Sequence, residues 1–346
     1  MRFRLSAALL AVCLCMSAAD EVTVNSVVAT VRASLRKKRK DAELAATLGQ
    51  VKLSQRLEDR VLEILESEGA GPQTLGELQR LRDVSRPLPV PANPPPGMAA
   101  PPPPSAVAER KVWVETRTKA RDYMHSLPDF VCSETVHRWV DPEGQEQWQP
   151  TPTIVADLTF FEQKEAYKVV SFDGKPTDKS ITELGGSMSQ GEFGSLLGAV
   201  FDPASSTDYR WDHWTILRKR PTAVFFYRIA ADRGPNLLMF NLPEGKTVST
   251  FAGQRGYVYI DCGTNTVTRL AEEAEDIPAG FPVQKSSAVL DYDYINIGED
   301  RFLLPLRAEV HLEAGKQHSL NTVEFSSYRK FSSATAITFG GTDVKK

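Results

Sequence analysis

One stretch of the sequence divides the chain into two parts. Residues 87–104 hold ten prolines in eighteen positions and no charged side chain. Proline has a fixed φ and no backbone N–H, so such a stretch joins neither a helix nor a sheet ladder and favours an extended, polyproline-type conformation. We therefore predict a proline-rich linker over residues 87–104, between a block at 20–86 and a block that begins at residue 105.

The first nineteen residues have the three-part pattern of a secretory signal peptide. Arg2 and Arg4 precede an apolar run, and small residues lead up to Ala19. The pattern predicts cleavage after Ala19 and a periplasmic or secreted protein. At about 12 residues the apolar run is too short to span a bilayer, and no later stretch predicts a transmembrane span.

Export would change the charge and leave two cysteines. Loss of Arg2 and Arg4 takes the formal net charge from −3 to −5, which is too weak to indicate nucleic acid or an anionic surface as the partner. The remaining cysteines are Cys132 and Cys262, and an oxidising compartment favours a disulfide between them. Two unpaired, buried thiols are the alternative, because a sequence does not give the separation of the two Cβ atoms.

The block at 20–86 has the pattern of a small bundle of three or four helices. Valines recur at helical spacing over 24–31. Asp41 and Ser54 are placed to cap the second and third helices, and Pro72 suits the first position of a fourth.

The Gly-Ala-Gly-Pro turn at 69–72 resembles the helix-hairpin-helix motif of DNA-binding proteins. In that motif, backbone N–H groups at the start of the second helix bind a phosphate. The basic run at 36–40 would add positive charge to such a site. Because an exported protein seldom meets DNA, we expect nucleic acid not to be a partner and the turn to join two packed helices.

The block at 105–340 is the predicted β domain, followed by a short tail at 341–346. It opens with a helix over 105–127, whose expected apolar face includes Val107, Val112 and Ala120. Segments with period-two alternation then follow one another with short turns, which predicts an antiparallel meander. A second helix is expected over 189–201. The predicted strands are 130–140, 152–163, 166–172, 207–218, 222–231, 246–252, 256–262, 265–272, 285–296, 301–314, 318–331 and 334–339.

One hairpin within this meander carries a family resemblance. The segment Arg-Gly-Tyr-Val-Tyr-Ile-Asp at 255–261 precedes a turn and the segment Val-Thr-Arg-Leu at 267–270. It resembles the hairpin of periplasmic lipoprotein-carrier-like proteins, over roughly 130–340, and the whole chain resembles exported bacterial proteins that join a helical block to such a domain. The resemblance implies an α+β fold with a curved antiparallel sheet, an incomplete barrel, wrapped around covering helices. It also implies that acyl chains or lipopeptides bind in the concave face without a metal or cofactor.

A sheet of this length must cover one apolar face. If the two predicted helices cover it only in part, an apolar groove remains for a lipid, and if they fill it, the result is a dry core. The candidate groove residues lie on the second helix and on aromatic strands, and they are Phe193, Leu196, Leu197, Val200, Tyr209, Trp211 and Phe226.

Patterns typical of enzymes were sought and not found. The five histidines have no metal-ligand spacing, and phosphate loops and dinucleotide fingerprints are absent. Asp291 and Asp293 share one face of a strand, which we interpret as a solvent-exposed face. We therefore expect no catalytic residue, metal or cofactor.

These patterns favour an exported, non-enzymatic binding protein that holds a lipid, acyl chain or lipopeptide in the concave face of the β domain. The alternative is an envelope structural or adaptor protein, in which the helical block docks a protein partner.

Overall fold

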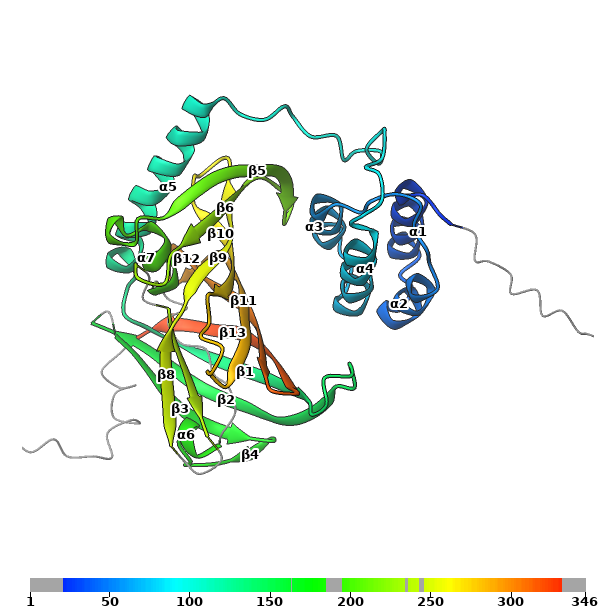
Figure 1. Cartoon of the computed structure of the whole chain (residues 1–346). Coiled ribbons are helices and arrows are strands. Elements are labelled where there is room, and N and C mark those ends of the chain that lie inside the picture. Colours follow the sequence, from blue (N-terminus) through cyan, green and yellow to red (C-terminus); the bar gives the residue numbers. More distant parts are fainter. Residues whose placement is uncertain (1–20, 163, 185–194, 234–235, 243–245, 332–346) are drawn as a thin grey trace, which may run out of the picture. The chain divides into compact units, whose positions relative to one another are not determined.

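The computed structural model describes residues 21–162, 164–184, 195–233, 236–242 and 246–331. It contains two compact units: a helical unit, to which the chain up to Ala100 belongs, and a β unit, which takes up most of the chain from Pro101 (Figure 1). The predicted signal peptide, the predicted strand at 334–339 and the predicted tail lie outside the described residues.

In its described residues the helical unit holds four helices around one apolar core, where the sequence left three or four open. Their buried faces come from valines and leucines at helical spacing, such as Val27, Val31, Leu48 and Leu65. The helices are α1 (Val24–Arg36), α2 (Asp41–Gly49), α3 (Asp59–Ser67) and α4 (Pro72–Ser85).

The start of α4 is capped from another helix. Gly71 is the N-cap and offers no side chain, so the carboxylate of Asp41 accepts hydrogen bonds from the backbone N–H of Gln73 at 2.8 Å and of Thr74 at 3.1 Å. It also accepts the Thr74 hydroxyl at 2.6 Å. The carboxylate therefore occupies the position where a helix-hairpin-helix protein would bind phosphate.

Two predicted helix caps are wrong: Asp41 does not cap α2, and Ser54 does not cap α3. Lys40, and not Asp41, is the N-cap of α2, since the Asp41 side chain is used by α4. Ser54 donates its hydroxyl hydrogen to the carbonyl oxygen of Val22, and α3 begins only at Asp59. In both cases a distant partner takes the polar side chain away from its own helix.

We expect Asp41→Ala to lower the free energy of unfolding of the helical unit by about 2 kcal/mol, because it removes three hydrogen bonds to a charged acceptor and leaves orphan N–H groups. Urea unfolding followed by circular dichroism measures this change. Asp83→Ala is the matched control, since Asp83 forms only exposed ion pairs on α4 and its loss should cost less than about 0.5 kcal/mol. Equal losses for the two variants would contradict the assignment of Asp41 as the cap.

The first part of the proline-rich segment packs against the helical unit. Met98 is 2% exposed within the helical core. The backbone N–H of Arg56 donates to the carbonyl oxygen of Pro89 at 2.8 Å, and the Arg32 guanidinium donates to that of Pro96 at 2.6 Å. Proline carbonyls that have no partner in a sheet thus accept hydrogen bonds from the Arg32 side chain and from the Arg56 backbone.

The β unit holds the remaining elements. Its helices are α5 (Ala106–Ser126), α6 (Ile181–Leu184), α7 (Ser195–Phe201) and the 3-10 turn η1 (Pro203–Ser205). Its strands are β1 (Phe130–Asp141), β2 (Gln149–Phe161), β3 (Lys164–Phe172), β4 (Lys175–Pro176), β5 (Asp208–Leu217), β6 (Arg220–Ile229), β7 (Leu237–Asn241), β8 (Thr247–Phe251), β9 (Gly253–Asp261), β10 (Val267–Glu275), β11 (Val283–Ile297), β12 (Asp300–Ala314) and β13 (Gln317–Lys330).

In the described residues, eleven strands form one sheet in the order β4-β3-β2-β1-β13-β12-β11-β10-β9-β6-β5, and β7 and β8 form a separate two-stranded sheet. The neighbouring strands from β4 through β9 to β6 pair antiparallel. The sheet does not close on itself, because β4 and β5 remain as edges. The fold class expected from the sequence, α+β with an incomplete barrel and helices, is therefore confirmed.

One face of this sheet, here called the inner face, is apolar from strand to strand. A row of direct cross-strand partners runs through eight neighbouring strands, and every member is at most 4% exposed. Because side chains alternate between faces along each strand, the row forms one continuous apolar band. Its members are Phe225, Val258, Leu270, Leu290, Ala308, Val323, Val136 and Ile154.

The next row, on the opposite face, is polar and includes a buried carboxylate. Asp291 is 1% exposed, and its two oxygens accept hydrogen bonds from Arg269 at 2.7 and 3.0 Å and from Arg307 at 2.7 Å. The expectation that Asp291 is exposed to solvent is wrong. Asp291 does lie on the face opposite the apolar band, but Arg269 and Arg307 on neighbouring strands cover its carboxylate.

Candidate functional site: the inner face of the sheet and helix α5

Helix α5 lies against the inner face beside α7 (Figure 1). Its buried stripe consists of Trp113, Thr116, Ala120 and Tyr123, which are spaced by three, four and three residues and so share one side of a helix. Val107, which the sequence analysis placed on this stripe, is 80% exposed. Lys111, Arg121 and Asp122 of α5 are exposed, as the helical period requires for residues off the buried stripe.

Trp113 is the centre of the packing under α5. Its ring stacks on Tyr209 of β5, with 4.1 Å between centroids and 6° between planes. It also meets the rings of Phe201 at 5.0 Å and Phe225 at 5.6 Å. Further along the helix, Tyr123 contacts Tyr292 of β11 edge-on at 6.1 Å. These aromatic contacts connect α5 to α7 and to three strands of the sheet.

Polar contacts hold α5 at its margins. Glu109 accepts the backbone N–H of Trp211, on the edge strand β5, at 2.9 Å. Glu115 accepts the side-chain amide of Asn265 at 2.6 Å, in the turn between β9 and β10. Lys119 donates to the carbonyl oxygen of Thr264 in the same turn. Such surface contacts are each weak, because water competes for the same groups.

Helix α5 and the adjacent strand β5 contain polar atoms that are not satisfied. Four of them, from α5 and β5, are buried and have no hydrogen-bond partner among the residues that the structure describes: Thr116 Oγ1, Tyr123 OH, Trp211 Nε1 and Thr215 Oγ1. Burial raises the pKa of the Tyr123 phenol well above its ordinary value, with the Glu165 carboxylate acting in the same direction. Each such atom costs about 1–3 kcal/mol relative to its hydrated state.

A pocket of about 270 Å³ opens where α5 meets α7 and η1. Ala120 and Gly198 belong to its wall, and Arg121, Asp122, His125 and Asp202 give it a polar rim. It lies directly outside the buried stripe of α5, since Ala120 belongs to both.

The structure separates the candidate groove residues into three groups. Leu197 and Val200 of α7 are 1% exposed and belong to the core under α5, and Leu196, Tyr209 and Trp211 are partly buried against the same core. Phe226 lies on the opposite face, where it contacts Tyr257 edge-on and the Arg210 guanidinium. Phe193 lies outside the described residues. A ligand-binding role for these residues stays a prediction.

Neither cysteine of the β unit is bonded in this structure. Cys132 lies in the core on β1, where burial raises the pKa of its thiol, and Cys262 is exposed in the turn after β9. Of the two alternatives left open by the sequence, the structure therefore has the two unpaired thiols, although only one of them is buried.

Several residues of this site were missed by the sequence analysis. Trp113, Thr116 and Asn265 were not singled out, yet they pack or hold α5. The spacing of Trp113, Thr116, Ala120 and Tyr123 was the available signal. It was obscured because valines at 107, 112 and 114 compete for the apolar stripe.

No group of three or more His, Cys, Asp and Glu side chains lies together in the described ranges in a way that could hold a metal ion. No described helix is both long enough and apolar enough to cross a bilayer.

No family model matches the sequence, and no curated protein sequence matches it. Among solved structures, a DUF1329 family protein from Desulfovibrio piger is similar at 10% identity and a TM-score of 0.35, over 67% of this chain and 97% of that one. A domain assigned to outer membrane lipoprotein sorting, from Vibrio parahaemolyticus, is similar at 6% identity and a TM-score of 0.29, over 66% and 94%. A LolA superfamily protein from Nitrosomonas europaea is similar at 8% identity and a TM-score of 0.27, over 66% and 96%. The second and third of these are described as lipoprotein-sorting and LolA superfamily proteins.

Proposed function

We propose that this chain is an exported, non-enzymatic binding protein whose β unit takes up the acyl chain of a lipid or lipopeptide between helix α5 and the inner face of the sheet. In the proposed cycle, α5 moves away from the sheet and the acyl chain takes its place on the apolar band. The export step rests on the signal-peptide pattern at 1–19 and stays a prediction.

The observation that supports this proposal most is that the buried stripe of α5 carries two unsatisfied polar atoms, the hydroxyls of Thr116 and Tyr123. A helix that belonged to a permanent core would leave few such atoms, because each one costs stability. When α5 moves away, these atoms become hydrated and recover that free energy. The closed state is therefore less stable than its apolar contacts alone would make it, which lowers the free-energy cost of opening.

The surface beneath α5 has the chemistry of an acyl-chain site. The apolar band extends over eight strands, which at about 4.8 Å per strand is longer than a fatty acyl chain requires. The pocket at the junction of α5 and α7 supplies a polar opening at the side of the band. An amphiphile would place its chain on the band and its head group near Arg121 and His125.

Replacing the unsatisfied hydroxyls by apolar isosteres tests this mechanism. We expect Thr116→Val combined with Tyr123→Phe to raise the free energy of unfolding by about 2–6 kcal/mol, because two buried polar atoms without partners are removed. The same change should weaken binding of a fluorescent fatty acid, dansyl-undecanoic acid, by more than about tenfold, because it stabilises the closed state. Denaturant unfolding and fluorescence titration measure the two effects.

Thr118→Val is the matched control. Thr118 lies on the exposed side of α5, where its hydroxyl donates to the Val114 carbonyl oxygen, and its loss should change neither property. The proposal fails if the unsubstituted protein does not bind the probe, or if the double variant binds it as tightly as the unsubstituted protein does.

A further inference from the structure

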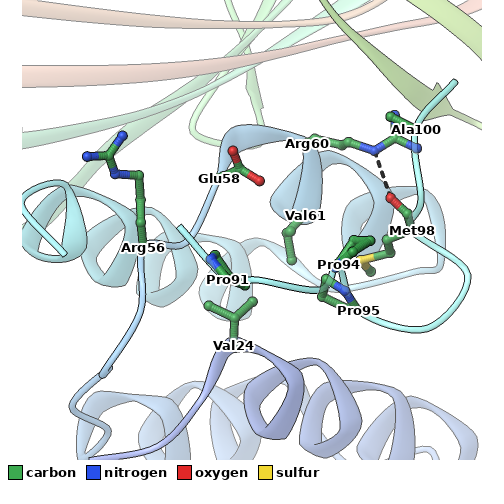
Figure 2. Close-up of a pocket in the computed structure, with 10 residues that line it drawn as sticks. All are labelled: Val24, Arg56, Glu58, Arg60, Val61, Pro91, Pro94, Pro95, Met98 and Ala100. Atoms are coloured by element: carbon green, nitrogen blue, oxygen red, sulfur yellow. Dashed lines mark hydrogen bonds between the residues drawn. The ribbon is translucent and has the colours of Figure 1, made fainter. Parts of the chain in front are cut away.

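The helical unit contains a pocket of its own. It has a volume of about 250 Å³ and lies between the start of α1, the start of α3 and the proline-rich segment (Figure 2). This is smaller than the 300–1,000 Å³ of sites for drug-sized ligands, so it suits a group about the size of one amino-acid residue.

The interior of this pocket is apolar. Val24, Val61 and Met98 contribute to it and are 0%, 4% and 2% exposed. Pro91, Pro94 and Pro95 complete the wall with ring methylenes, as Figure 2 shows. Such a surface favours an aliphatic or aromatic body over a polar one.

The rim carries a cation whose hydrogen bonds are incomplete. Arg60 donates from Nε to the carbonyl oxygen of Met98 at 3.1 Å (Figure 2). Its Nη2 donates to the carbonyl oxygen of Ala99 at 3.2 Å. Its Nη1 is buried and has no hydrogen-bond partner in the described part of the chain. Both of its acceptors are neutral carbonyls, so the guanidinium lacks the carboxylate partner that a half-buried arginine normally has.

The charges around the pocket indicate a singly charged anion. Arg56 and Arg60 face one acid in the lining, Glu58, while the next acid, Asp59, is paired with Arg82 at 2.5 Å. The lining side chains alone have one excess positive charge, and Glu63, one turn along α3 and outside the lining, offsets part of it. Desolvation lowers the pKa of the Arg60 guanidinium, although Glu63 and Glu58 act in the opposite direction. A carboxylate matches this balance better than a doubly charged phosphate, which Glu58 would repel.

We propose that this pocket binds an apolar group of about one residue in size that ends in a carboxylate, with Arg60 as the cationic partner. The carboxylate would complete the hydrogen bonding of the guanidinium as an arginine–carboxylate pair. The two sources of such a group are a free small organic acid and the C-terminal residue of a partner peptide. This site is independent of the acyl-chain site, because it belongs to the other unit.

The NMR signal of the Met98 methyl group reports on binding in this pocket, because Met98 belongs to its lining. The chain from residue 20 has four methionines, which are Met98, Met124, Met188 and Met239. Protein labelled at the methionine methyl groups therefore gives few NMR signals. The signal of Met98 is identified by its loss in Met98→Leu. Labelled protein from residue 20 to its end is titrated with 4-phenylbutyrate in one arm and with a short peptide ending in a free C-terminal leucine in the other. Each arm is repeated with the corresponding neutral amide.

We expect a saturable shift of the Met98 signal with at least one of the two acids, and binding at least tenfold weaker with its amide. A response to the free acid assigns the site to small acids, and a response to the peptide alone assigns it to chain termini. Arg60→Gln should weaken binding at least tenfold, whereas Arg86→Gln should leave it unchanged, since Arg86 is exposed at the end of α4.

Arg56→Gln keeps the test decisive if Arg60→Gln does not fold. Arg56 is exposed and lines the same pocket, so its loss should weaken binding about threefold through charge alone. The proposal is overturned if the Met98 signal responds to neither acid, if acid and amide bind equally, or if Arg86→Gln weakens binding as much as the pocket variants do.

Discussion

Replacing Trp113 by alanine is expected to lower the free energy of unfolding of the β unit by about 3–5 kcal/mol, the range for a large aromatic side chain lost from a packed core. Trp113 is 3% exposed and meets the rings of Tyr209, Phe201 and Phe225. Nothing else on α5 has as many ring contacts in the described structure. Calorimetric or denaturant unfolding measures the loss.

The same substitution should also make the inner face easier to reach. Because the lost contacts belong to the closed position of α5, the open state becomes more populated and the association rate of dansyl-undecanoic acid should rise at least tenfold. Val114→Ala is the matched control, since Val114 is the next residue on α5 and is 42% exposed. If Trp113→Ala lowers stability but leaves the association rate unchanged, the probe does not enter beneath α5.

The sheet could be predicted because its information is local. Period-two alternation and short turns indicated antiparallel strands, and the hairpin of β9 and β10 is where the sequence placed it. The turn is formed by Asp261, whose carboxylate accepts the backbone N–H groups of Gly263 and Thr264. Such turn chemistry depends on residues two or three positions apart, which a sequence displays directly.

Contacts between distant elements could not be predicted in the same way. Asp41 caps α4 rather than its own helix, and Asp291 is buried because two arginines on neighbouring strands reach its carboxylate. Both depend on which elements become neighbours in space. The sequence marks these acids as polar, but it does not say which group will neutralise them.

The candidate groove residues were predicted from residue type. Which of them lie near α5 depends on the face of the sheet that each one occupies. Phe225 and Phe226 are adjacent and both aromatic, yet only Phe225 contacts Trp113. A shift of one residue moves a side chain to the opposite face. Composition indicates that a strand is apolar, while the pairing register decides which of its aromatic residues reaches α5.

Composition also failed to predict that part of the proline-rich segment packs against the helical core. Its proline content predicted an extended spacer over the whole of 87–104. In the structure, Leu88 and Met98 pack against the helical core, and the helical unit includes the chain up to Ala100. Two apolar residues among many prolines are enough to hold the segment, because hydrogen bonds from Arg32 and Arg56 to proline carbonyls add to their burial.

The central claim is that a ligand enters beneath α5, and locking this helix tests it most directly. Glu115 and Asn265 are in contact, with 2.6 Å between Oε2 and Nδ2. Cysteines at both positions, in a Cys262→Ser background, can be joined by a short bis-maleimide that contains a cleavable disulfide. Cys132 is buried and should not react.

Fluorescence titration with dansyl-undecanoic acid then compares the cross-linked and the cleaved protein, and a protein with only the Asn265→Cys substitution controls for the reagent. We predict that cross-linking weakens binding by at least twentyfold and that reduction of the linker restores it. Equal binding in the cross-linked and cleaved forms would contradict entry beneath α5.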